Sequence, residues 1–258
     1  MLIGLLTLAY LLFGRVQETF LLNPELSKSV NIYVKDKERK KEIDSLIKVT
    51  GKTQEAFEKK MKGVYEKKLV SLNMNRNSTL TDFQSEYNLF YKDLNVLTTS
   101  FVNNEMDIRA FINPGEWDSI MNKLLKTPDN EKERKSLSAE IKKLHGKMLA
   151  TCNKYILAPA DKVTAGNLLD DYEKKCDSLV NAFLNLNYRY LQIIRPYYTP
   201  RADFLQIRNQ MARERQSYSS FLVNMRFKLL AIIPEKNWES LAKELNQVFT
   251  DVVPGASK

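Results

Sequence analysis

Apolar residues recur three, four and seven positions apart along almost the whole chain. This spacing places them on one stripe of an α-helix and leaves polar residues on the opposite side. Such stripes cover residues 38–72, 81–112, 114–125, 131–158, 167–194, 199–233 and 235–249. Residues 30–34, VNIYV, are the one short strand candidate. The pattern therefore predicts an all-α protein, a bundle of about seven amphipathic helices.

Polar caps and prolines divide these stripes. Thr81 with Gln84, and Asn113 with Glu116, have the spacing of a capping box, in which two side chains bond the first amides of a helix. Pro159, Pro196 and Pro234 each follow an apolar stripe. Because proline cannot continue a helix, we expect a turn at each of the three.

The first fourteen residues, MLIGLLTLAYLLFG, carry no charged side chain. Together with the apolar positions up to Leu22 they predict a membrane-anchor helix over residues 1–22. A cleaved signal peptide and a buried core helix are the alternatives. The basic residues that follow favour a cytoplasmic body, whereas a long domain after a first apolar segment is usually exported. We expect the part after the anchor on the extracytoplasmic, periplasmic side.

The two tryptophans occur in similar contexts about 120 residues apart. Trp117 follows Pro114 at the start of a short helix, and Trp238 follows Pro234 in the same way. The order of helices, long, long and short, also repeats. We therefore predict two related helical units, residues 23–127 and 128–258, made by tandem duplication, with chance similarity of helix caps as the alternative. Each tryptophan is predicted to be a structural latch that packs over the preceding long helix.

Composition narrows the chemistry. The 258 residues include one histidine and two cysteines, which excludes multi-histidine metal sites and cysteine-rich zinc sites. His145 has no nucleophile motif beside it, so we interpret it as structural. Cys152 and Cys176 lie on apolar stripes on either side of a turn. They are predicted to be buried thiols, with a disulfide between them as the alternative in an oxidising compartment.

The net charge of +9 is concentrated near the predicted anchor. Residues 35–68 hold twelve Lys and Arg against seven Asp and Glu. A solvated helix face is the plainest interpretation. Contact with anionic lipid is the second interpretation, and nucleic acid the third and least supported. The lipid contact would fall to these residues: Lys35, Lys37, Arg39, Lys40 and Lys41.

Tyrosine and arginine alternate around the turn near Pro196. This mixture is typical of a helix corner or of a protein interface. The predicted partner surface consists of the following residues: Tyr188, Arg189, Tyr190, Arg195, Tyr197, Tyr198 and Arg201.

These features lead to a function without catalysis. The first hypothesis is a membrane-anchored structural or adaptor subunit of an envelope complex, which presents helical surfaces to other proteins. The alternative is an extracytoplasmic ligand-binding sensor or chaperone-like domain with an apolar cleft between its two halves. A helical nucleic-acid-binding protein is third. No catalytic residue, cofactor or metal is predicted, and the protein is expected to be part of an oligomer or hetero-complex.

Overall fold

The computed structural model describes residues 21, 23–125 and 130–252, and within these ranges the chain is helical and has no strand. The predicted all-α class is thus confirmed. The predicted anchor, residues 1–22, lies outside the described residues except for Leu21. None of the helices described combines the length and the apolar character needed to cross a bilayer.

Helices of the first half follow the predicted stripes with one addition. They are α3 (Pro24–Tyr33), α4 (Lys37–Lys60), the π-helix η1 (Met61–Glu66), α5 (Lys67–Met74), α6 (Leu80–Ala110) and α7 (Pro114–Leu124). The addition is α3, which replaces the predicted strand at 30–34. Asn23 caps its first turn by accepting from the amide of Glu25, and Pro24 occupies the first position. Leu26 and Val30, four residues apart, are both buried, which fits a helical period rather than an alternating one.

The second half repeats the order of the first. It consists of α8 (Asn130–Tyr155), α9 (Pro159–Ile194), α10 (Arg201–Ile232) and α11 (Glu235–Val252). Pro159 begins α9 instead of only ending α8, so α9 starts earlier than predicted. Proline fits the first turn of a helix, where its missing N–H has no intrahelical partner.

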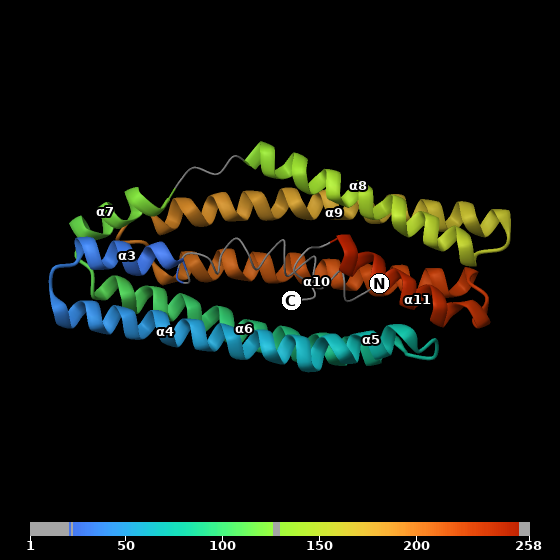
Figure 1. The fold of residues 1–258 in the computed structure, drawn as a ribbon, viewed down its shortest axis with the longest axis horizontal. Helices are drawn as coiled ribbons and strands as arrows, with labels where there is room; N and C mark the ends of the chain where they lie inside the picture. The colour runs from blue at the N-terminus through green and yellow to red at the C-terminus, as the bar shows by residue number, and fades with distance from the viewer. Residues whose placement is uncertain (1–20, 22, 126–129, 253–258) are drawn as a thin grey trace.

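Long rods lie side by side along the molecule (Figure 1): the continuous α4–η1–α5, then α6, α10 and α9, with α8 packed along α9. Helices α6 and α10 form the seam between the two halves. Helices α3 and α7 pack together at one end of the rods, and α11 packs on α8 and α5 at the other. The rods bury one continuous apolar core.

One of the two predicted capping boxes is displaced. Asn113 and Glu116 form theirs as predicted. At the start of α6, however, the box is formed by Thr79 and Asp82 rather than by Thr81 and Gln84. Beginning the helix at Leu80 places the carboxylate of Asp82 in the first turn, where it accepts from the amide of Thr79 and suits the positive end of the helix dipole.

The π-helix η1 explains a change of register between the halves. Before it, the buried Thr50 and Phe57 match the buried Tyr172 and Leu179 of α9, 122 positions later. After it, buried residues match at 121 positions, as Leu69 does with Tyr190. A π-turn accommodates one extra residue in a helix. The first half therefore contains one residue more at η1 and returns to the common register beyond it.

Each tryptophan fastens the other half of the molecule. The indole N–H of Trp117 donates to the carbonyl of Arg195 at the end of α9, at 3.0 Å. That of Trp238 donates to the carbonyl of Asn73 in the last turn of α5, also at 3.0 Å. Both rings are buried. That the two halves arose by duplication remains a prediction. Two halves related in this way would be expected to make matching contacts with each other, as the two tryptophans do.

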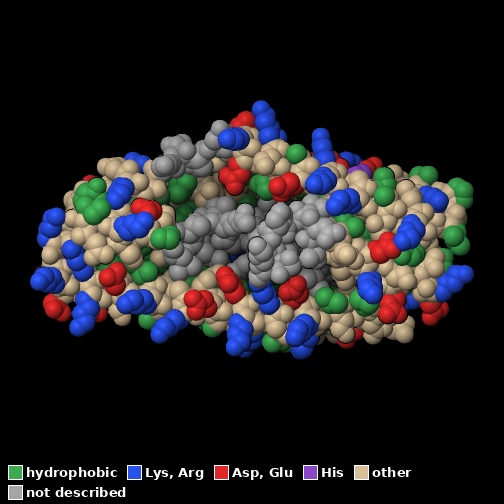
Figure 2. All heavy atoms as spheres, in the orientation of Figure 1, with side chains coloured by type: hydrophobic (Ala, Val, Ile, Leu, Met, Phe, Trp, Pro, Cys, Tyr) green, Lys and Arg blue, Asp and Glu red, His purple; other side chains and the backbone are tan. Residues whose placement is uncertain are grey.

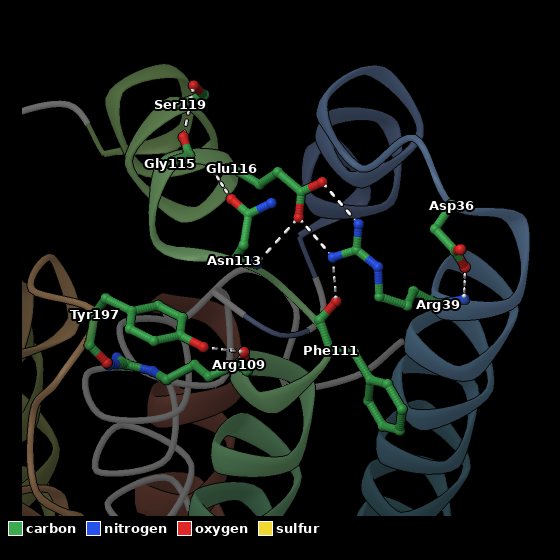
Figure 3. A network of polar contacts seen from close by, with 9 residues as sticks. All are labelled: Asp36, Arg39, Arg109, Phe111, Asn113, Gly115, Glu116, Ser119 and Tyr197. Carbon is green, nitrogen blue, oxygen red and sulfur yellow. Dashed lines mark hydrogen bonds and ion pairs between the residues drawn. The ribbon is translucent and has the colours of Figure 1, made fainter.

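A polar network fixes the end of the molecule where α3, α4 and α7 meet (Figure 3). The guanidinium of Arg39 donates to both carboxylate oxygens of Glu116, at 2.8 and 3.0 Å, and to the carbonyl of Phe111. Glu116 also accepts from the amide of Asn113. Arg39 holds the pKa of the Glu116 carboxyl below its ordinary value of 4.5.

We expect this pair to make stability fall in acid. Because the folded pKa of Glu116 is depressed, its contribution is present above pH 4.5 and is lost as the pH drops through the lower folded pKa. Arg39→Met should cost about 0.5–1 kcal/mol at pH 7, since the side chain of Arg39 is 33% exposed. Urea unfolding between pH 3 and pH 7 should show a shallower acid loss in the variant. An unchanged pH dependence would contradict this assignment.

Candidate ligand-binding groove

A groove follows the seam between the two halves and consists of two adjoining cavities. Both are lined from α6 and α10, and each has a volume of about 490 Å³. They share Asn88, Tyr91 and Gln216, which lie where the cavities meet. We name them the neutral cavity and the basic cavity after the side chains that line them.

The neutral cavity has a lining of amides and hydroxyls. Its amides belong to Gln84, Asn88, Gln216 and Asn224. Its hydroxyls belong to Tyr87, Tyr91, Ser219 and Ser220. These groups both donate and accept hydrogen bonds, and none of the lining residues that the structure describes is charged.

The floor of the neutral cavity contains a hydroxyl without a partner. Tyr91 and Ser219 bond each other through their hydroxyls at 2.5 Å. Tyr87 is only 6% exposed; its hydroxyl lies near Ser219, which Tyr91 already bonds, and it forms no hydrogen bond of good geometry within the described part of the chain. Burial raises the pKa of Tyr87 well above 10 and that of Tyr91 to about 12, so both remain protonated donors.

Among the described residues, four cations and no carboxylate line the basic cavity. The cations are Lys92, Arg208, Arg213 and Arg215. Amides accompany them, among them Asn95 and Asn209. With no acidic group in the lining, the positive charges add to one another across the cavity.

Arg208 differs from the other buried arginines in what surrounds it. Among the described residues three arginines and one glutamate are buried: Arg109, Arg208, Arg226 and Glu105. Arg109 donates to Glu105 and to three main-chain carbonyls. Arg226 donates to the carbonyls of Leu72 and Asn75. In all three arginines the Nε atom is buried without a hydrogen-bond partner among the described residues. Arg208 differs in that the rest of its guanidinium also bonds no described residue, and it lies 5.8 Å from the ring centres of Phe101 and Tyr190.

The two cavities are related in the same way as the two halves. Phe83 and Phe204, like Trp117 and Trp238, are 121 positions apart, and all four are buried. The same offset takes Tyr87 to Arg208 and Asn88 to Asn209. The positions that line the two cavities thus correspond at this offset, with Tyr87 in the neutral cavity where Arg208 lies in the basic cavity.

The predicted Tyr/Arg surface is divided by the fold. Tyr190 is buried and donates to Glu105, and Tyr197 donates to the carbonyl of Arg109 (Figure 3). The arginines bond neighbouring helices: Arg189 bonds Gln210, Arg195 bonds Asn122, and Arg201 bonds Asn103. Tyr188 and Tyr198 remain on the surface, and Tyr198 is 82% exposed. Most of these tyrosines and arginines therefore pack at the corner between helices, the first of the two interpretations given for this mixture.

The basic residues proposed to meet lipid also have partners within the chain. Lys35 donates to the carbonyl of Ile32, Lys40 to that of Asn31, and Arg39 binds Glu116 as described above. Lys37 and Lys41 are exposed on α4. On the face shown in Figure 2, basic and acidic side chains are interspersed over the described residues. A solvated face accounts for this distribution.

Cys152 and Cys176 are both free and buried, so the structure contains no disulfide between them. Burial raises the pKa of Cys152 to about 12 and that of Cys176 to about 11. The Cys176 thiol lies 3.4 Å from the hydroxyl of Tyr218. These thiols are part of the core rather than of a reactive site.

We therefore expect both thiols to resist modification in the folded protein. At pH 8 they are protonated and shielded, and only the thiolate reacts. A colorimetric thiol assay should detect close to none in buffer and both in urea. Rapid reaction of either thiol in buffer, without loss of helix signal, would contradict their burial.

The remaining chemistry is sparse. The Nε2 atom of His145 lies 3.0 Å from Asp170, and no group of His, Cys, Asp and Glu within the described ranges is arranged to hold a metal. Sequence reasoning missed Tyr87 and Arg208. The available signal was an arginine on the apolar stripe of α10, four residues after Phe204 and three before Met211.

No protein-family model, no curated protein and no solved structure was found to match this chain.

Proposed function

We propose that this protein is a non-enzymatic binding protein that holds an extended polar ligand in the α6–α10 groove. The observation that carries the proposal is the pair of adjoining cavities, with two buried polar groups on their floors that lack hydrogen-bond partners in the described chain. Buried polar groups are nearly always bonded, so each such exception calls for an explanation. A bound ligand supplies one.

The size and the location of the groove support this proposal. Ligand sites usually measure about 300–1,000 Å³ and often lie between structural units. Each cavity falls within this range, and both lie between the two halves. The sequence led us to expect an apolar cleft at this place. The lining is instead polar, which favours a ligand rich in hydrogen-bonding groups over an acyl chain or an apolar peptide.

Filling the neutral cavity should abolish ligand binding. Ser220 is exposed on its rim, so Ser220→Trp can place an indole in the cavity without disturbing the core. Gln206→Trp, at an exposed position of the same helix that lines neither cavity, is the matched control. Protein purified from its native host would be compared by native mass spectrometry. We expect a retained non-covalent species in the wild type and in the control, and its loss in Ser220→Trp. Identical spectra for all three proteins would refute the proposal.

The adaptor function predicted from the sequence is the second candidate, and Tyr198 favours it. An aromatic side chain that is 82% exposed, at the α9–α10 corner beside Arg195, has the composition found in protein interfaces. Tyr198→Ala should weaken crosslinking to a partner protein in native membranes if this corner is the contact. An unchanged crosslinking pattern would exclude the corner.

A further inference from the structure

We infer that the ligand of the groove carries an anionic oxygen group, a phosphate or a carboxylate, which Arg208 binds in the basic cavity, next to a hydroxyl-rich part in the neutral cavity. This inference rests on the proposed function and specifies its ligand. The chemical class is an acidic sugar or polyol.

The buried charges do not balance. Within the described chain the interior holds three arginines against one glutamate. Arg109 already bonds Glu105 at 3.0 Å, and Tyr190 bonds the other oxygen of that carboxylate at 2.8 Å. Glu105 therefore attracts Arg208 electrostatically, but its oxygens are engaged elsewhere. A buried cation without a bonded partner is costly, and an anion in the cavity that it lines would remove that cost.

Arginine suits this task because of its shape. A guanidinium presents several N–H groups in one plane and can bond two oxygens of a phosphate or carboxylate at once. Phe101 and Tyr190 lie at 5.8 Å from its centre and limit its rotation. Lys92 and Arg213, exposed on the rim, add positive charge that attracts an anion from solution.

The neutral cavity specifies the other part of the ligand. Its four amides and four hydroxyls can donate to and accept from the same ligand, which is what vicinal hydroxyls require. Tyr87 occupies the position that Arg208 has in the basic cavity. The unpartnered hydroxyl of Tyr87 is thus a donor for a neutral oxygen, as Arg208 is for a charged one. One ligand that spans both cavities would satisfy both.

The test uses the full chain and four probes in isothermal titration calorimetry: inorganic phosphate, glucose 6-phosphate, glucuronic acid and glucose. We expect the two acidic sugars to bind more tightly than glucose and than phosphate alone. Arg208→Gln should weaken the acidic sugars by about tenfold to a hundredfold and leave glucose unchanged, because only the charged contact is lost. Preference for glucose 6-phosphate over glucuronic acid would identify a phosphate ligand, and the reverse a carboxylate.

Two variants serve as controls. Lys41→Gln removes one charge from an exposed position outside the groove and should leave every affinity unchanged. Tyr87→Phe removes one hydroxyl from the neutral cavity and should weaken all three sugars but not phosphate. Helix content by circular dichroism confirms that each variant is folded. Equal weakening by Lys41→Gln and Arg208→Gln would show a general charge effect and overturn the inference.

Failure of this inference can be separated from failure of the proposed function. If Ser220→Trp loses the native ligand while no acidic probe binds, or while Arg208→Gln binds acidic probes like the wild type, the groove binds a ligand that is not anionic. The inference then falls and the proposed function stands. If Ser220→Trp, Gln206→Trp and the wild type retain the same species, the proposed function falls and the inference falls with it.

Discussion

Replacing Arg109 with alanine is expected to lower the free energy of unfolding by about 3–5 kcal/mol, the usual effect of removing one partner from a buried ion pair. The guanidinium lies 3.0 Å from Glu105 and donates to the carbonyls of Ile194, Pro196 and Tyr197. It also stacks at 4.4 Å from the centre of the Trp117 ring. Its removal leaves the buried carboxylate of Glu105 bonded to the hydroxyl of Tyr190. It also removes the guanidinium donors from three carbonyls at and just after the end of α9.

The pH dependence of this loss gives a second measurement. Burial raises the pKa of Glu105 in the wild type, and Arg109 opposes that effect. Without Arg109 the folded pKa rises further. Both proteins lose stability as the pH rises above 4.5, but the wild type stops losing it at its own raised folded pKa. The variant's deficit should therefore grow as the pH rises above the wild type's folded pKa. Urea unfolding followed by circular dichroism at pH 5 and pH 8 would show the larger deficit at pH 8.

A double-mutant cycle separates the ion pair from packing. Glu105→Gln with Arg109→Met keeps volume and removes both charges, so it should recover a large part of the loss. Additive losses in the double variant, or a loss below about 1 kcal/mol for Arg109→Ala, would contradict the importance of the pair.

Most of the helices could be predicted from the sequence because interactions between residues close together in the chain set their boundaries. Asn113 with Glu116, and the prolines at 196 and 234, act within one or two turns of themselves. The start of α6 was less determined, because Thr79 and Thr81 each precede a suitable residue by three positions. The choice between them depends on contacts of the whole turn, which periodicity does not contain.

The groove could not be predicted in the same way. An arginine on an apolar stripe reads as a surface residue, and Arg208 becomes exceptional only when Arg109 and Arg226 are seen to have acceptors that it lacks. Two members of the predicted Tyr/Arg surface, Tyr190 and Tyr197, face a second helix for the related reason: they bond Glu105 and the carbonyl of Arg109. Which helix faces which is a long-range property, and residues far apart in the sequence decide it.

The pair of tryptophans led us to predict a repeat of two halves, and in the structure the two tryptophans have matching surroundings. In each half an arginine stacks on the tryptophan of its own half and donates to the end of a rod in the other. Arg109 lies over Trp117 and bonds the end of α9. Arg226 lies over Trp238 and bonds the end of α5. Each half therefore closes the open carbonyls of the other.

Matched substitutions of the tryptophans should consequently have matched effects. Trp117→Ala and Trp238→Ala should each lower the free energy of unfolding by about 3–5 kcal/mol, because each leaves a large cavity and one carbonyl without its donor. Trp117→Phe and Trp238→Phe keep most of the ring and should cost about 1–2 kcal/mol each. Urea unfolding followed by circular dichroism gives these values.

Since the chain has two tryptophans, the fluorescence of each phenylalanine variant reports the opposite end of the molecule. We expect fluorescence and helix signal to change in one transition, because each end is fastened by the other half. Separate transitions, or a loss confined to one tryptophan, would mean that the two fastenings are not equivalent.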